Sequence, residues 1–300
     1  MYDQKCPHPM ASAGKITRLK ALTLAMSLLL LVAPGLTQEI KDIVYAITDS
    51  RPLKLDLYLP EKTKNAPIIM HMHGGGWKKG SKTSCTVKFL IEHGYAVASI
   101  EYRFSDEAIF PAQIHDCKAA VRFLKSQASK YGYNPKKMAV SGSSAGGQLA
   151  ALLGSSHGVE PLEGEVGKHL KQNTRVQAVI DFFGCSDFIL RGETQPKRAN
   201  SKTGIVSKYL GGPVNEQPEQ AKLASAVTHM DPNDPPYLIF HGKADTSVLP
   251  DQSERLHSVC KEHNVESTLV MLDGVGHSSK PFCSPENKKL MVKFLDKHLK

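Results

Sequence analysis

The chain has 300 residues, of which 41% are hydrophobic and 22% charged, which suits one large globular domain or two small ones. Its 38 basic side chains outnumber its 29 acidic ones and give a formal net charge of +9. The basic residues are not gathered into a stripe with interleaved aromatic residues, so the composition argues against a nucleic-acid-binding protein.

The first 37 residues have the order of parts that is typical of a secretory signal. Three basic side chains between positions 15 and 20 precede an apolar run over residues 21–33, and Ala33-Pro34-Gly35 supplies small residues for cleavage. The run is shorter than the roughly 20 apolar residues that a membrane-spanning helix needs. We therefore expect residues 1–37 to hold a signal peptide and the start of a secreted or periplasmic mature chain, without stable membrane insertion. An uncleaved anchor is the alternative.

Five cysteines follow this leader, an odd number that leaves at least one thiol free if any disulfide forms. None has the spacing of a zinc site, and no nucleotide or dinucleotide motif is visible, so we expect neither metal nor cofactor. We interpret the cysteines mostly as small buried residues, with room for one or two bridges in an oxidising compartment. The sequence leaves the pairing open among Cys85, Cys117, Cys185, Cys260 and Cys283.

The first half of the mature chain predicts a strand-rich start followed by alternation. Residues 53–59 alternate apolar and polar side chains, which predicts an antiparallel edge strand with one wet face. Residues 68–73 are almost continuously apolar, as in a strand buried on both faces. Besides these two strands we expect strands at 43–45, 95–100 and 138–141 and helices at 85–93 and 114–130.

The second half continues the alternation around one long irregular segment. Residues 186–230 lack a clear period and are too long for an ordinary loop, so we expect a cap-like insertion there. Strands are expected at 176–183, 237–242 and 267–272, and helices at 252–263 and 285–299. Strands that alternate with helices predict a doubly wound α/β domain over residues 38–300, with a mostly parallel central sheet and helices on both faces.

One motif suggests a nucleophile. Gly142-Ser143-Ser144-Ala145-Gly146 fits G-x-S-x-G and lies between a strand-like and a helix-like segment. In such an elbow the serine backbone is strained, and only glycines two residues before and after it leave room for the turn. We expect Ser144 to expose its hydroxyl at the amino terminus of the following helix, where the helix dipole favours negative charge.

A serine hydroxyl needs a positioned base, and in an open α/β sheet that base must come from a loop at the carboxyl ends of the strands. Asp245 and His277 follow two expected strands, and the order Ser144, Asp245, His277 matches that of α/β-hydrolases. Competing residues are His241 for the base and Asp187 for the acid. We interpret His257 and His263 as positions on a surface helix and Asp273 as a turn residue. Asp116 is interpreted as a structural partner of a cation such as Arg103.

A glycine-rich loop supplies the remaining requirement, which is stabilisation of an oxyanion. His73-Gly74-Gly75-Gly76 follows a buried strand and matches the HGGG-type loop that donates backbone N–H groups. We expect Gly75 and Gly76 to donate together with the N–H of Ala145. His73 is interpreted as a structural hydrogen-bonding residue.

Together these motifs resemble those of the α/β-hydrolase carboxylesterases, near the hormone-sensitive-lipase-like and bifunctional feruloyl/acetyl-xylan-esterase-like families. In the first family the acid often lies in a different local motif from the one that holds Asp245, so the resemblance favours the second family and a prolyl-oligopeptidase-like relationship. The matching residues cover most of the mature chain: His73-Gly74-Gly75-Gly76-Trp77, Tyr102-Arg103, Phe110-Pro111-Ala112, the elbow, Asp245 and His277.

The resemblance implies a secreted serine esterase that acts on a small-molecule or polysaccharide ester. Trp77, Lys78 and Lys79 follow the glycines, which suggests a substrate-binding aromatic face and positive charge at the pocket rim. The polar run over residues 191–198 argues against a lipid-handling lid. We therefore expect short acyl esters, such as acetyl or feruloyl esters of polysaccharide. The alternatives are a serine peptidase of prolyl-oligopeptidase type and a non-catalytic binding protein, and the sequence does not indicate the oligomeric state.

Overall fold

The computed structural model describes residues 37–61 and 64–300, which belong to one compact unit. The expected signal peptide falls on residues 1–36 and so lies outside the described residues. Within the described ranges, every helix is too short or too polar to cross a bilayer.

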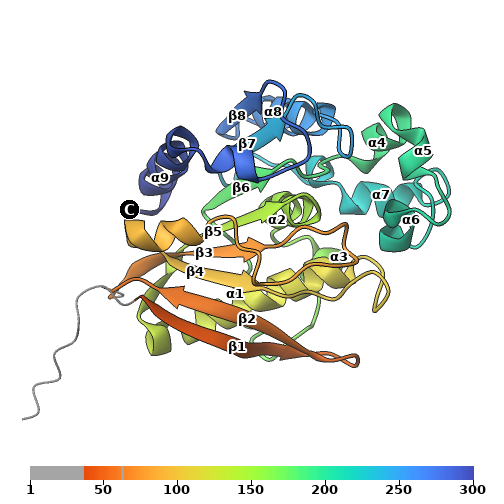
Figure 1. Ribbon diagram of the computed structural model, residues 1–300. Helices are drawn as coiled ribbons and strands as arrows, with labels where there is room; N and C mark the ends of the chain where they lie inside the picture. Colours follow the sequence, from red (N-terminus) through yellow and green to blue (C-terminus); the bar gives the residue numbers. More distant parts are fainter. Residues whose placement is uncertain (1–36, 62–63) are drawn as a thin grey trace, which may run out of the picture. The chain divides into compact units, whose positions relative to one another are not determined.

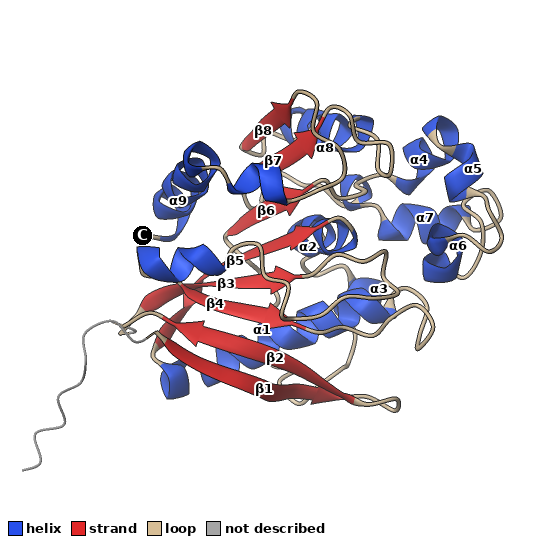
Figure 2. Ribbon diagram, viewed as in Figure 1, coloured by secondary structure: helices blue, strands red, loops and turns tan. Residues whose placement is uncertain are grey.

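An eight-stranded sheet forms the centre of this unit, with strand order β1-β2-β4-β3-β5-β6-β7-β8 (Figures 1 and 2). Strand β2 runs against its neighbours β1 and β4, and every other pairing in the sheet is parallel. The strands are β1 (Gln38–Ile47), β2 (Pro52–Leu59), β3 (Ala66–Met72), β4 (Ala96–Ile100), β5 (Tyr133–Ser143), β6 (Ala178–Phe182), β7 (Tyr237–Gly242) and β8 (Ser267–Leu272).

Two apolar cores cover the two faces of the sheet, because successive side chains of a strand point to opposite faces. In β3, Ile68 and Met70 join one core and Ile69 joins the other. Helices α1 (Ala112–Tyr131), α2 (Ala145–Ser155) and α8 (Asp251–Glu262) pack into the first core. The 3₁₀ helix η1 (Lys88–His93) and helix α9 (Pro285–Leu299) pack into the second. The shorter elements α3 (Glu160–Glu163), η2 (Ala226–Thr228) and η3 (Lys280–Cys283) lie in connections.

The segment expected as an insertion folds into four short helices that pack on one another. They are α4 (Phe188–Thr194), α5 (Pro196–Ala199), α6 (Ile205–Leu210) and α7 (Pro218–Ala224). Figure 1 shows them beyond the carboxyl ends of the parallel strands, at the right of the view. Loops from the sheet and residues from these helices therefore meet at the same edge.

Two sequence predictions need correction. Residues 53–59 do not form an edge strand with a wet face, because β1 takes the edge and most of β2 is buried. The polar Asp56 is only 1% exposed, since Lys82 lies 2.8 Å from its Oδ1 atom and neutralises it. Residues 85–93 form only the 3₁₀ helix Lys88–His93. The five cysteines of the described residues are all free, so no bridge joins them.

Candidate active site

The G-x-S-x-G motif forms a sharp strand-to-helix turn with Ser144 at its tip. Ser144 joins β5 to α2 with φ 57° and ψ −117°, a conformation that a residue with a side chain rarely adopts. A Cβ atom on Gly142 would lie 2.0 Å from the carbonyl oxygen of Gly146, and one on Gly146 would lie 2.1 Å from that of Met72. Both glycines are therefore required by space, as the sequence predicted. The backbone N–H of Ser144 donates to Phe182 O at 2.8 Å and ties the turn to β6.

The structure brings the three candidate triad residues into one hydrogen-bonded chain from loops after β5, β7 and β8. Ser144 Oγ lies 2.7 Å from His277 Nε2, and His277 Nδ1 lies 2.6 Å from Asp245 Oδ2. Because a carboxylate only accepts, Nδ1 carries the ring proton and Nε2 is left to accept from the serine hydroxyl. The ring of Phe183 packs edge-on against His277, with centroids 4.7 Å apart, and limits its movement.

Asp245 is held as a carboxylate by donors on both oxygens. Its Oδ1 accepts from the N–H groups of Ser247 at 2.8 Å and Val248 at 3.1 Å. Its Oδ2 lies 2.6 Å from His277 Nδ1 and 3.3 Å from His241 Nε2. Burial of this 2%-exposed residue would raise its pKa, but the hydrogen bonds from His241 and His277 hold the pKa well below its usual range. Asp245 thus stays charged and orients the imidazole of His277.

The competing residues have other partners. His241 is fully buried, with Nδ1 2.7 Å from Ser253 Oγ and Nε2 3.0 Å from Val248 O, so neither nitrogen is available to Ser144. Asp187 caps helix α4 by accepting from the N–H of Leu190 at 3.0 Å. Asp273 is exposed and pairs with Lys243 at 2.8 Å. The sequence did not show that His241 also contacts Asp245.

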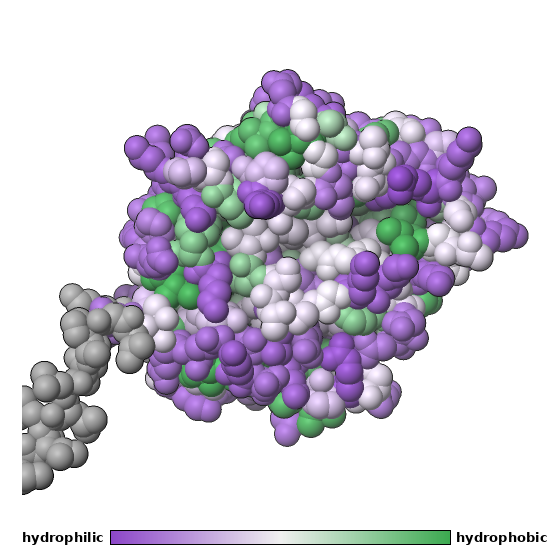
Figure 3. All heavy atoms as spheres, viewed as in Figure 1, coloured by the Kyte–Doolittle hydropathy of each residue, from purple (hydrophilic) through white to green (hydrophobic). Residues whose placement is uncertain are grey.

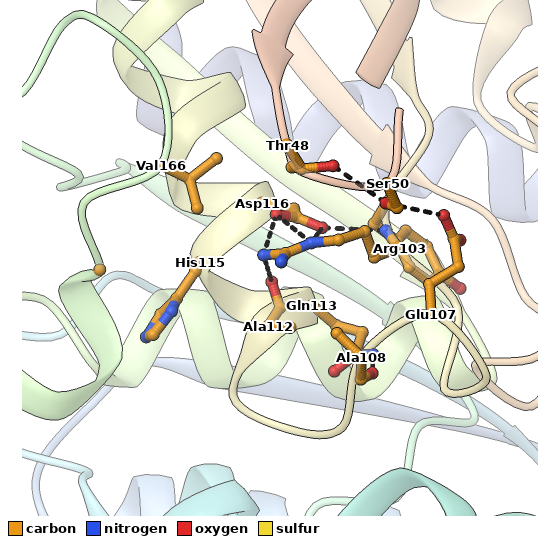
Figure 4. A network of polar contacts seen from close by, with 12 residues as sticks. Thr48, Ser50, Arg103, Glu107, Ala108, Ala112, Gln113, His115, Asp116 and Val166 are labelled. Atoms are coloured by element: carbon orange, nitrogen blue, oxygen red, sulfur yellow. Dashed lines mark hydrogen bonds and ion pairs between the residues drawn. The ribbon is translucent and has the colours of Figure 1, made fainter. Parts of the chain in front are cut away.

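Asp116 has the structural role that the sequence suggested. Its two carboxylate oxygens accept from Nε and Nη2 of Arg103, the shortest contact being 2.7 Å, and Oδ2 also accepts from the backbone N–H of Arg103 at 2.9 Å (Figure 4). This bidentate pair fixes the loop after β4. The neighbouring Tyr102 in that loop donates to His73 O at 2.9 Å, and its ring stacks on the imidazole of His73. The ion pair of Arg103 and Asp116 therefore helps to hold Tyr102 against His73, at the start of the glycine loop.

The glycine loop lies directly against the nucleophile. A Cβ atom on Gly74 would lie 3.5 Å from Ser144 Cβ, and Gly75 and Gly76 have φ values of 122° and 61° that favour glycine. Among the described residues, the backbone N–H groups of Gly75, Gly76 and Ala145 have no recorded acceptor. These are the three N–H groups that the sequence predicted as oxyanion donors.

The prediction that Trp77 offers an aromatic face at the pocket rim is wrong. Trp77 borders the pocket, but it is 3% exposed because its ring stacks on Tyr209 at 4.2 Å between centroids. Its indole N–H donates to Gln148 Oε1 at 3.0 Å. Trp77 instead anchors the glycine loop to α6 and α2. The adjacent Lys78 and Lys79 are exposed, as expected.

A pocket of about 750 Å³ opens above Ser144 and His277. Two residues that line the pocket, Phe183 and Arg191, were not predicted from the sequence. Phe183 lies at the end of a predicted strand, and this position could have indicated it. Five basic side chains also line the pocket, and within the described part of the chain no acidic one does: Lys78, Lys79, Arg191, Lys197 and Arg198. No cluster of metal-ligating side chains occurs among the described residues.

Comparison with known proteins identifies the family. The BD-FAE family model matches residues 55–259, so the chain belongs to the BD-FAE family of α/β-hydrolase esterases. Two similar proteins of Mycobacterium tuberculosis are the probable carboxylic ester hydrolase LipM, 33% identical over 221 residues, and the esterase LipC, 28% identical over 222. These alignments cover 69% and 72% of this chain but only 48% and 53% of LipM and LipC, so the chain spans about half the length of these relatives.

Solved structures support the same class. A truncated carbohydrate esterase from gut microbiota superposes with a TM-score of 0.79 at 32% identity, over 87% of this chain and 96% of that one. The propionate-bound esterase Est2 of Thermogutta terrifontis superposes with a TM-score of 0.70 at 25% identity, over 85% and 93%. The predicted α/β-hydrolase fold is confirmed, and the relatives that match this chain are described as esterases or carboxylic ester hydrolases.

Proposed function

We propose that this protein is an exported serine carboxylesterase that hydrolyses short acyl esters of carbohydrate, with acetyl and feruloyl esters of polysaccharide as the first candidates. The observation that carries the proposal is the hydrogen-bonded chain of Ser144, His277 and Asp245 beneath the pocket. Export rests on the signal-like order of residues 1–37.

In the proposed reaction, Ser144 Oγ attacks the ester carbonyl while His277 Nε2 takes the hydroxyl proton. The tetrahedral intermediate collapses when His277 returns this proton to the leaving alcohol, which leaves an acyl group on Ser144. Water then repeats the sequence and releases the acid. Asp245 does not exchange a proton; its charge orients His277 and stabilises the imidazolium that forms twice in each cycle.

The oxyanion of both intermediates would be bound by the N–H groups of Gly75, Gly76 and Ala145. The position of Ser144 at the amino terminus of α2 adds the positive end of the helix dipole. Loss of one such donor typically costs about 10²–10³ in rate.

Three observations support short acyl groups on a carbohydrate. The first is the similarity to a carbohydrate esterase and to an esterase that is described as propionate-bound. The second is a pocket entrance with several charged residues. The third is the face of the molecule shown in Figure 3, where apolar residues form separate groups among hydrophilic and intermediate ones. A lipid-binding surface would need a broader apolar patch.

The test is a substrate panel. Aryl esters from acetyl to palmitoyl, acetylated xylan, feruloyl esters and aminoacyl anilides are compared with and without a serine-directed inhibitor. The proposal expects inhibitor-sensitive hydrolysis with a maximum at two to four carbons and release of acetate from xylan. A maximum at ten carbons or longer would contradict the carbohydrate-ester assignment, and cleavage of anilides alone would indicate a peptidase.

A further inference from the structure

Arg191 is a buried cation that the triad does not use. It lies on α4, it lines the pocket, and only 2% of its surface is exposed. Its Nη2 donates to Ser247 O at 2.9 Å, whereas its Nε is buried and has no hydrogen-bond partner among the described residues. None of the ion pairs within those residues includes Arg191, unlike the buried Lys82 and Lys118, which each face a carboxylate.

A guanidinium ion carries five N–H donors in a planar fork that fits a carboxylate. Removing such a charge from water without a partner is costly, and buried charges in proteins are normally paired. Arg191 satisfies one donor with a neutral carbonyl and leaves the positive charge unbalanced. A negatively charged partner for Arg191 could bind in the pocket that Arg191 borders.

The other charged side chains that line the pocket are also positive. Lys78, Lys79, Lys197 and Arg198 line it and are exposed, and no ion pair within the described residues includes any of them. Basic side chains elsewhere often have a partner, as Lys202 has in Glu216. A cleft lined by one sign of charge concentrates ligands of the opposite sign.

From the unpartnered Arg191 and the four basic residues around the pocket we infer that the ester substrate carries a carboxylate, which Arg191 binds. This inference rests on the proposed esterase function and specifies its substrate class. The carboxylate could belong to the alcohol portion, as in a uronic acid residue, or to the acyl portion, as in a half-ester of a dicarboxylic acid. In both cases the guanidinium donates hydrogen bonds to the same chemical group, a carboxylate.

Two substrate pairs separate these sources. For the alcohol arm, an acetylated methyl glucuronoside is compared with the methyl glucoside acetylated at the same position, which has a hydroxymethyl group in place of the carboxylate. For the acyl arm, 4-nitrophenyl succinate is compared with 4-nitrophenyl butyrate, which has the same number of carbons. The readout is the ratio of kcat/KM for the acidic substrate over the neutral one.

The variants separate charge recognition from structure. Arg191→Gln removes the charge but keeps a neutral donor, and Arg191→Lys restores the charge without the planar fork. The matched structural control is Gln195→Leu, because Gln195 directly follows α4, donates to Thr246 O at 3.1 Å and does not line the pocket. The charge control is Lys208→Gln, an exposed basic residue on α6 outside the pocket.

We expect the wild-type ratio in one arm to exceed one by roughly 10- to 100-fold, the range for a charge-assisted hydrogen bond. Arg191→Gln should bring the ratio close to one, Arg191→Lys should restore part of it, and the two controls should keep the wild-type ratio. A ratio near one in both arms, or a ratio that survives Arg191→Gln, would overturn the inference.

A binding measurement keeps the inference separate from the esterase proposal. If the wild type hydrolyses none of the four esters, the esterase proposal fails, and the affinity of the Ser144→Ala protein for the glucuronoside and for the succinate is measured instead. Tighter binding of the acidic member that is lost on adding Arg191→Gln would support the carboxylate site. Equal binding of acidic and neutral members would contradict it.

Discussion

The side of the pocket that holds the triad (the triad wall) and the side formed by the insertion helices (the insertion wall) differ in how many of their polar groups have hydrogen-bond partners. On the triad wall, Ser144, His277 and Asp245 contact one another, and both oxygens of Asp245 accept at least one hydrogen bond. On the insertion wall, Arg191 has a buried Nε with no partner among the described residues. The triad wall is thus organised before a substrate arrives, whereas the insertion wall holds charge that a substrate can balance. Chemistry and specificity are therefore expected to respond to different mutations.

The largest effect is expected from breaking the triad wall at its nucleophile. Ser144→Ala should lower kcat by about 10⁵–10⁶, and His277→Ala should do nearly the same, because triad members act as a unit. The double variant should be little worse than either single one. Kinetics on 4-nitrophenyl acetate measure these losses.

Ser143→Ala is the matched control, since the neighbouring Ser143 contacts Thr86 Oγ1 at 3.3 Å and not the histidine. Loss of turnover in Ser143→Ala with retention in Ser144→Ala would mean that the elbow has been assigned one residue too late.

The next largest effect is expected from the acid. Asp245→Asn should lower kcat by about 10⁴, because the amide no longer fixes the proton on His277 Nδ1. Asp187→Asn should change kcat little, since asparagine caps a helix about as well as aspartate. Steady-state kinetics of the two variants give the ranking, and the reverse ranking would move the catalytic acid to Asp187.

Much of the fold and of the triad could be predicted from the sequence, because the residues that determine them are close together in the chain. The bounds of β7, β8 and α9 agree with the predicted ranges 237–242, 267–272 and 285–299. In α9 the reason is visible in the chain itself, since Ser284 caps the helix by accepting from the N–H of Asn287 and Pro285 follows it. Gly142 and Gly146 likewise mark a turn that only glycines allow.

What could not be predicted depends on partners that are distant in the sequence. The polar Asp56 indicated a wet strand, but its burial depends on Lys82. Trp77 indicated a ring that stacks on the substrate, but the ring stacks on Tyr209 and its N–H donates to Gln148. Arg191 gave no signal within a run of polar residues, because what distinguishes it is the absence of a partner in the described fold.

A smaller effect, on stability, tests how the protein treats a buried carboxylate that has too few donors. Asp181 on β6 is fully buried, Oδ1 accepts from the N–H of Gly184 at 2.9 Å, and Oδ2 has no partner among the described residues. Burial raises the pKa of Asp181 to about 7 from 3.8. Since the folded state holds this proton more tightly than the unfolded state, its contribution to stability is complete below pH 3.8 and is lost as pH rises to 7.

Asp181→Asn should remove this pH dependence, because the amide does not titrate. Relative to wild type, the free energy of unfolding of the variant should rise by about 3 kcal/mol between pH 5 and pH 8, at about 1.4 kcal/mol per pH unit up to the folded pKa. Urea denaturation at both pH values measures it. Parallel pH profiles for variant and wild type would show that Asp181 is ionised in the folded protein.

The smallest effect concerns the exposed charges of the insertion wall. Raising the ionic strength from 0.05 to 0.5 M should lower kcat/KM for an acidic ester a few-fold, because salt screens exposed charges over about a Debye length. The neutral partner ester should change less. Equal salt effects on both esters would mean that Lys197 and Arg198 do not attract the substrate.

The central claim is that Ser144 is the nucleophile, and covalent labelling tests it most directly. The protein is treated with a serine-directed organophosphate, its intact mass is measured, and the modified peptide is sequenced by mass spectrometry. The account predicts one adduct per chain, located on Ser144, formed in step with loss of esterase activity, and absent from Ser144→Ala. An adduct on Ser143 or another serine, or full activity in protein labelled at Ser144, would contradict it.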